Sequence, residues 1–233
     1  MKLRATDIGR MASASELIFA AIREGIADGS IPEGEALRQD RIARLFNVSR
    51  IPVREALARL EEQGLVTTQR YRGAVVSSLS IEDVREIFEF RAVLEPHVIR
   101  ESVARMRPET LDLARSRCDA FATEPNSAEW GALNRAFHYT LYRDSGRPYF
   151  LGVIEAALHR VDRYLRAQLV LTDGMATARR EHSAILAACV AGDAESAADL
   201  TRDHIVGASR SLVAFLQRQR AEQAGRGPAE TAA

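Results

Sequence analysis

The 233-residue sequence lacks the features that would place it in a membrane or in an oxidising compartment. Its uncharged stretches are too short to span a bilayer, and the N-terminus has no apolar segment typical of a secretory signal. It has only two cysteines, Cys118 and Cys189, and because they lack metal-type spacing we expect free thiols. These absences predict a cytoplasmic protein, and the length is ample for a sizeable buried core.

Net charge is also absent, because 32 basic residues balance 32 acidic residues. A neutral chain is not a general binder of polyanions, so the distribution of charge matters more than its sum. Between residues 38 and 72, eight arginines stand against four acidic residues. This local excess of positive charge can form a phosphate-facing patch on a neutral protein.

The arginine-rich region contains the pattern of a short helix at residues 49–60, SRIPVREALARL. Ser49 can cap its N-terminus, and a proline is tolerated in the first turn. Apolar residues at helical spacing form a stripe for burial, which consists of Val53, Ala56, Leu57 and Leu60. Because Arg50 and Arg54 lie off this stripe, the segment has the layout of a recognition helix.

Two neighbouring segments complete this pattern. Residues 39–46, QDRIARLF, predict a second amphipathic helix, and a tight connector at 47–48 joins it to the recognition helix. Residues 64–68 and 74–76 are strand-like, and the basic segment 69–73 between them ends in glycine. The sequence therefore predicts a helix-turn-helix followed by a β-hairpin wing.

Residues 37–76 resemble the winged-helix domain of GntR-type bacterial transcription regulators, whose pattern VSRxPVREALxxLxxxGLV is matched almost letter for letter. The resemblance implies binding to double-stranded DNA. The residues at the family's contact positions are Ser49, Arg50, Arg54, Arg70, Arg72 and Gly73. Arginines can reach guanine O6 and N7 in the major groove, whereas hydroxyl and backbone N–H groups can bind phosphate. The alternative is a solvated basic face.

One departure from that family concerns the predicted second helix. Many relatives carry Glu-Arg where this chain has Gln39 and Asp40. Arg38 and Arg41 flank this pair, and we take both as candidate DNA contacts, with the choice between them left open.

From residue 81 onward the sequence shows helical periodicity and no convincing strand. The apolar stripes and the breakers between them predict helices near 81–106, 109–122, 128–145, 149–171, 176–191 and 194–219. We therefore predict a mostly α fold, with a winged helix-turn-helix domain at 13–78 and an all-α bundle of about six helices at 81–219. Residues 1–12 are predicted to be a mobile arm and residues 220–233 a disordered tail.

Two histidines flank the predicted turn at Gly192-Asp193. His182 lies ten residues before this turn and His204 eleven residues after it, so an antiparallel hairpin places both imidazoles at nearly the same height. Periodicity turns both inward, and Asn134 and His138 share one face of another predicted helix. This set suits Zn²⁺, Ni²⁺ or Mn²⁺, with positions left for carboxylate and hydroxyl oxygens. The alternative is a set of hydrogen-bonded core histidines.

The helical half resembles the FCD effector domain of the FadR-type branch of GntR regulators. The matching stretches are 87–95, 134–138, 145–150 and those from 181–182 to 203–204. This resemblance implies a metal site at the four residues named above. Asn134 stands where an acidic residue is common, and its neutral carbonyl oxygen is a weaker ligand than a carboxylate.

Arg91 is another inward-facing polar residue of the helical half. It can pair with Glu95 at i, i+4 inside the bundle, or it can anchor an effector carboxylate in a bidentate manner. The FCD resemblance suggests the second role. Tyr142 can hydrogen-bond an effector or can simply belong to the core.

Together these patterns predict a bacterial transcription regulator, a repressor that binds a pseudo-palindromic operator as a homodimer. Its helical domain is expected to sense a small organic acid, such as a sugar acid, a hydroxy acid or a dicarboxylate. One alternative is a sensor of the metal ion itself, and another is a metal-dependent enzyme that uses the histidines. We expect no enzyme, because no motif places a base or nucleophile beside the cluster and a DNA-binding domain would be unexplained. No membrane partner is expected.

Overall fold

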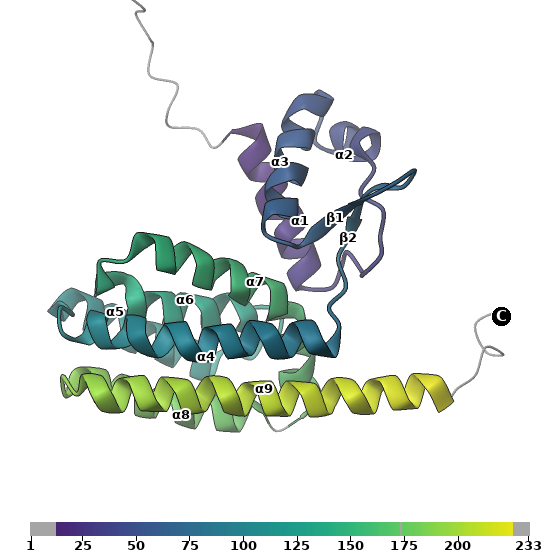
Figure 1. Ribbon diagram of the computed structural model, residues 1–233. Coiled ribbons are helices and arrows are strands. Elements are labelled where there is room, and N and C mark those ends of the chain that lie inside the picture. The colour runs from purple at the N-terminus through teal and green to yellow at the C-terminus, as the bar shows by residue number, and fades with distance from the viewer. Residues whose placement is uncertain (1–12, 173, 226–233) are drawn as a thin grey trace, which may run out of the picture. The chain divides into compact units, whose positions relative to one another are not determined.

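The structure is a computed structural model that describes residues 13–172 and 174–225 (Figure 1). The chain divides between Ser78 and Leu79 into two compact units, and each is described by itself. The predicted N-terminal arm at 1–12 lies outside the described residues. In the described part of the chain, none of the helices is long and apolar enough to cross a membrane.

The N-terminal unit is a winged helix-turn-helix. Its elements are α1 (Ala14–Ala27), α2 (Gln39–Leu45), α3 (Arg50–Glu62), β1 (Val66–Gln69) and β2 (Gly73–Val76). A capping box starts α1, because the side chains of Ser13 and Glu16 each accept a hydrogen bond from the other residue's backbone N–H. The strands pair antiparallel, with Val66 opposite Val76. The predicted helix-turn-helix and wing are confirmed.

Helix α3 buries the predicted apolar stripe, which consists of Val53, Ala56, Leu57 and Leu60. These side chains belong to one core with the apolar face of α1, including Ile18 and Ile22. Ser49 is the N-cap residue of α3, but its side chain makes no capping hydrogen bond, which differs from the prediction. Ser49 is exposed, so its hydroxyl group can bond to water or to a partner instead.

The second unit consists of six α-helices, as predicted, and the residues described at 79–172 and 174–225 contain no strand. The helices are α4 (Ile81–Val103), α5 (Pro108–Thr123), α6 (Trp130–Tyr142), α7 (Pro148–Leu171), α8 (Gly174–Val190) and α9 (Ala194–Gly225), with a 3-10 turn, η1 (Arg143–Ser145), after α6. Helix α9 continues past residue 220, where the sequence predicted a disordered tail. The segment AEQA at 221–224 consists of good helix formers, which explains the extension.

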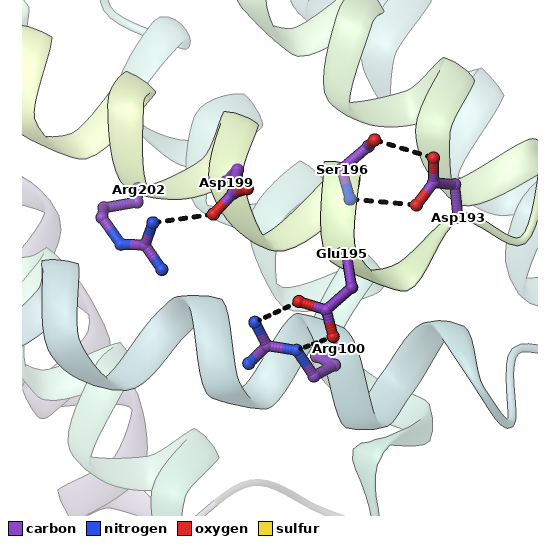
Figure 2. A network of polar contacts seen from close by, with 6 residues as sticks. All are labelled: Arg100, Asp193, Glu195, Ser196, Asp199 and Arg202. Carbon is purple, nitrogen blue, oxygen red and sulfur yellow. Dashed lines mark hydrogen bonds and ion pairs between the residues drawn. The ribbon is translucent and has the colours of Figure 1, made fainter.

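Helices α4 and α9 lie side by side along the helical unit (Figure 1). Near the start of α9, Arg100 of α4 donates to both carboxylate oxygens of Glu195, at 2.6 and 2.8 Å (Figure 2). Asp193 accepts a hydrogen bond from the backbone N–H of Ser196 at 3.0 Å and so caps the helix. Gly192, at φ 70°, makes the preceding turn in the left-handed region. These contacts fix where α9 begins and hold its first turn against α4.

Cys118 and Cys189 are free thiols buried in the apolar core of the helical unit. Burial raises the pKa of Cys189 to about 12 and also raises the pKa of Cys118. Both cysteines are therefore inert core residues in the described structure.

Candidate metal centre and DNA-binding face

Three histidines from three helices meet inside the helical unit. His138 comes from α6, His182 from α8 and His204 from α9, and all three are buried. Potential ligand atoms of the three rings lie within 4.8 Å of one another. The ring centroids of His182 and His204 are 4.9 Å apart, so the α8–α9 hairpin brings these two imidazoles side by side. This is the geometry expected from their spacing about the turn.

His182 has the least ordinary environment of the three. Its ring packs against Phe121 and Phe137, with centroid distances of 4.7 and 4.6 Å. Neither ring nitrogen has a hydrogen-bond partner among the described residues, although both are buried. A buried polar atom without a partner costs about 1–3 kcal/mol, so a core histidine satisfied by hydrogen bonds does not describe His182.

His204 is oriented by a carboxylate. Its Nδ1–H donates to Glu181 Oε2 at 2.8 Å, because an ionised carboxylate can only accept. The lone pair of Nε2 is then available on the other side of the ring. This carboxylate–histidine arrangement is typical of histidines that ligate metals.

His138 is oriented by a tyrosine. The hydroxyl group of Tyr142 donates to Glu95 Oε2 at 2.7 Å, so its oxygen accepts from His138 Nδ1–H at 3.2 Å. Nε2 of His138 is buried and has no hydrogen-bond partner in the part of the chain that the structure describes. Each of the three imidazoles thus offers at least one nitrogen atom to a common point, and the donor set fits a divalent ion of the zinc type.

The charge state of the cluster also suits a cation. Burial lowers the pKa of His138 well below its usual value, and the neighbouring His182, His204 and Arg91 lower it further. Burial and His204 likewise lower the pKa of His182. His138 and His182 are therefore held neutral, which is the form that binds a metal ion.

A cavity of about 370 Å³ lies beside the cluster and is lined by His204, Glu181 and Asn134. Asn134 lies half-buried on this wall, so the fourth predicted ligand borders the same space as His204. Polar residues from α7 and α9 line it further along, among them Gln168 and Ser211. Among the described residues, Tyr142 does not line the cavity; it is buried in the core, where its hydroxyl group contacts His138.

Arg91 both pairs with Glu95 and lines the cavity. Its Nε donates to Glu95 Oε1 at 2.6 Å, and both side chains are buried. The i, i+4 pair that the sequence left open is therefore present. Arg91 also lines the cavity, so the pair does not remove its guanidinium from that space.

The exposed face of α3 carries the arginines that the sequence singled out. Arg50 and Arg54 are both exposed, while the opposite face of the helix is buried. Arg50 forms an ion pair with Asp40 of α2, an interaction that the sequence analysis did not anticipate. Arg41 lies 3.5 Å from Glu35 in a second exposed pair. Arg38 is exposed at the start of α2.

The turn of the wing presents three basic or small residues. Arg72 donates to the carbonyl oxygen of Gly34 at 3.1 Å, which holds the wing to the preceding loop. Arg70 lies with its guanidinium 5.0 Å from the ring centroid of Tyr71. Tyr71 is 91% exposed and has φ 67°, and Gly73 has φ 73°, so two left-handed residues build the turn. Sequence reasoning had not singled out Tyr71, although an exposed aromatic in a basic turn was a readable signal.

A helix-turn-helix with a wing that exposes arginines, joined to a separate helical unit with a polar centre, defines a two-domain transcription regulator. Residues 14–76 match the family described as bacterial regulatory proteins, gntR family, and residues 86–207 match the FCD domain. The chain therefore belongs to the GntR family of DNA-binding transcription regulators, in the branch that carries an FCD domain.

Individual relatives agree with this assignment. The chain is 34% identical over 142 residues to an uncharacterized HTH-type transcriptional regulator of Agrobacterium vitis, covering 58% of this chain and 81% of the relative. It is 28% identical over 198 residues to the HTH-type transcriptional repressor GlaR of Escherichia coli K12, covering 79% of this chain and 89% of that repressor. The solved structure of E. coli McbR/YncC matches with a TM-score of 0.76 over 90% of this chain and 100% of that chain, and at 21% identity it shows the fold alone. These relatives confirm a regulator and not an enzyme.

Proposed function

We propose that this regulator represses its target genes by binding a pseudo-palindromic operator as a homodimer in the cytoplasm. We further propose that a small organic acid, bound together with a divalent metal ion in the helical unit, controls this binding. The observation that carries the proposal is the buried cluster of His138, His182 and His204, of which His204 lines a cavity of about 370 Å³.

The metal site consists of the three imidazoles and the side-chain oxygen of Asn134. Unpartnered nitrogen atoms on His138 and His182, and a carboxylate that orients His204, support this assignment. Zn²⁺, Ni²⁺ and Mn²⁺ all accept such ligands. When bound, the ion supplies a positive centre that attracts carboxylate and hydroxyl oxygens of an effector. Asn134 is neutral, so it compensates less of the ion's positive charge than an aspartate at the same position would.

An effector with a carboxylate fits the cavity because Arg91 and His204 of the histidine cluster both line it. Gln168, Thr172 and Ser211 form a hydrogen-bonded polar group elsewhere on the wall, with N···O distances of 2.9 and 3.0 Å. Such groups suit hydroxyl oxygens, which favours a hydroxy acid or a sugar acid. A sensor of the metal alone would need no cavity of this size, which lies in the range of small-molecule sites.

On the DNA side, we assign base contacts to α3 and phosphate contacts to its surroundings. Arg54 is the better candidate for guanine, because Asp40 partly neutralises Arg50. The hydroxyl group of Ser49 and the backbone N–H group of Gly73 can donate hydrogen bonds to phosphate. The remaining phosphate contacts are assigned to Arg38, Arg41, Arg70 and Arg72, which are all exposed.

The homodimer is assigned to the exposed apolar side of α4. Phe90 and Val93 are 39% and 75% exposed and lie at i, i+3, so they form one apolar patch on the exposed face of the helix. A second copy of the chain would cover this patch about a two-fold axis. Val93→Glu should then shift the protein to monomers in sedimentation velocity and weaken operator binding.

The proposal is tested by selecting the operator from a random DNA pool and then screening carboxylic acids for release, with and without Zn²⁺. Elemental analysis should find up to one metal ion per chain. A hydroxy or sugar acid should lower operator affinity only when the metal is present. Protein without bound metal, or acids that leave operator affinity unchanged, would contradict the proposal. Release by Zn²⁺ alone would replace it with a sensor of the metal ion.

A further inference from the structure

A continuous chain of buried hydrogen bonds runs from the cavity wall to the histidine cluster. Arg91 Nε donates to Glu95 Oε1 at 2.6 Å, and the Tyr142 hydroxyl group donates to Glu95 Oε2 at 2.7 Å. His138 Nδ1 lies 3.2 Å from the same hydroxyl oxygen. Glu95 is thus shared, with one carboxylate oxygen for the guanidinium and the other for the phenol.

The donor and acceptor properties of Arg91 and Glu95 determine which atom carries the proton in each of these hydrogen bonds. A guanidinium can only donate and a carboxylate can only accept, so the Tyr142 hydroxyl group must point at Glu95. The phenol oxygen can then only accept from His138, which places the imidazole proton on Nδ1. Nε2, which has no hydrogen-bond partner within residues 13–172 and 174–225, is left with a free lone pair.

A contribution to the stability of the fold does not by itself explain why these buried residues form such a chain of hydrogen bonds. The side chains of Arg91 and Glu95 are 3% and 0% exposed, so both charges have lost their hydration. A buried ion pair repays this cost only in part, and an apolar replacement of similar volume is often as stable. The chain does have a definite effect on one neighbour, because it sets the tautomer and the orientation of the His138 ring.

We infer that Glu95 and Tyr142 are positioning residues for the metal site, which keep His138 in the Nδ1–H tautomer with Nε2 directed at the other two imidazoles. Arg91 supports this arrangement, because its hydrogen bond to Glu95 holds the carboxylate in place from the cavity side. This inference rests on the proposed metal site, since it assigns the residues that prepare one of its ligands. Partners of this kind typically contribute a factor of about 10–100 to metal affinity.

The first test is a Zn²⁺ titration of metal-free protein against a chromophoric chelator. Tyr142→Phe removes one oxygen atom and should weaken zinc binding by about 10–100-fold. Glu95→Gln should weaken it at least as much, because an amide whose oxygen faces Arg91 turns its NH₂ group to the phenol and so reverses the proton direction. Tyr139→Phe, which alters an exposed tyrosine of the same helix, is the matched control and should bind like the wild type.

The second test reads the tautomer directly, by long-range ¹H–¹⁵N correlation spectra of the histidine rings in metal-free protein. His138 should be the Nδ1–H tautomer in the wild type, a mixture in Tyr142→Phe and mainly the Nε2–H tautomer in Glu95→Gln. A purely structural role of Tyr142 would leave the tautomer unchanged. If Glu95→Gln does not fold, Tyr142→Phe decides the question by itself.

The outcomes separate this inference from the proposed function. If the wild type binds no Zn²⁺, the metal site is wrong and the inference is overturned with it. If the wild type binds Zn²⁺ and His182→Ala does not, the site stands. Equal zinc affinity and an unchanged His138 tautomer in Tyr142→Phe would then overturn the positioning role alone.

Discussion

The two units of the molecule carry their functional side chains in opposite ways. In residues 13–78, every buried side chain is apolar and the arginines of α3 are exposed. In the helical unit, buried polar and charged side chains are found between residues 91 and 204, and they include Arg91, Glu95 and His138. One unit offers charge to an external polyanion, and the other surrounds a polar centre with apolar helices.

The proposed function accounts for this difference by what each unit would bind. Phosphate groups lie outside the protein, so exposed arginines can meet them with little desolvation cost beforehand. A small ligand must be enclosed, and each buried polar group then needs a partner from the surrounding helices. Glu95 and Glu181 are such partners, and they come from α4 and α8. We therefore expect the exposed site to tolerate the loss of a single side chain, whereas the buried site should depend on a connected set of residues.

The largest expected effect is on operator binding by the exposed arginines of the N-terminal unit. The double variant Arg50→Ala, Arg54→Ala should lose about 1–3 kcal/mol of operator binding for each base contact removed, and its zinc affinity should stay unchanged. Arg115→Ala, Arg117→Ala removes the same charge from an exposed face of the helical unit and serves as the control. Fluorescence anisotropy with the selected operator measures both. Equal operator affinity of the two double variants would rule out base reading by α3.

The sequence predicted the exposed unit almost completely, because its signals are local. The stripe from Val53 to Leu60 follows from helical spacing alone. The pair of His182 and His204 also followed from local counting, since both lie at similar distances from the turn at Gly192.

The hydrogen-bond partners of the buried site were not predictable in the same way. Tyr142 and Glu95 are 47 residues apart and meet only through the packing of α4 against α6. Glu181 reaches His204 from the neighbouring helix for the same reason. The ion pair between Arg50 and Asp40 likewise depends on the angle between two helices. Periodicity gives the face of a side chain, but the opposite helix supplies its partner.

The next largest effect should come from removing the metal. A ligand at 100 times its Kd stabilises the folded state by about 2.7 kcal/mol, so a chelator should lower the melting temperature of the zinc-loaded protein. His182→Ala should abolish this dependence, and Asn134→Asp should increase it because a formal charge then faces the cation. Differential scanning calorimetry gives the readout. His97→Ala, an exposed histidine outside the cluster, should melt and respond to the chelator like the wild type. A chelator response that persists in His182→Ala would contradict the assignment.

A smaller effect is expected where the helical unit begins. The backbone N–H of Leu79 donates to the Tyr164 hydroxyl group at 2.7 Å in a buried position, and Arg220 donates to the carbonyl oxygen of Leu79 at 3.4 Å. Tyr164→Phe leaves that N–H group without this acceptor, so the helical unit should lose about 1 kcal/mol in chemical unfolding. Tyr139→Phe alters an exposed hydroxyl group and should cost nothing measurable. An unchanged unfolding midpoint in Tyr164→Phe would show that water replaces the phenol.

The smallest effect should come from the exposed ion pair between Arg100 and Glu195 (Figure 2). Hydrogen bonding from Arg100 lowers the pKa of Glu195 in the folded protein, so the pair stabilises the fold above the usual glutamate pKa of about 4.3. This contribution is lost as the pH falls through the lower, folded-state pKa. Arg100→Gln should therefore melt slightly below the wild type at about pH 7, by less than Tyr164→Phe, and the gap should close toward about pH 3. Added salt at about 1 M should close it as well, because solvent screens exposed charges. A gap that persists in acid and in high salt would mean that Arg100 acts through packing of its stem against α9 and not through its charge.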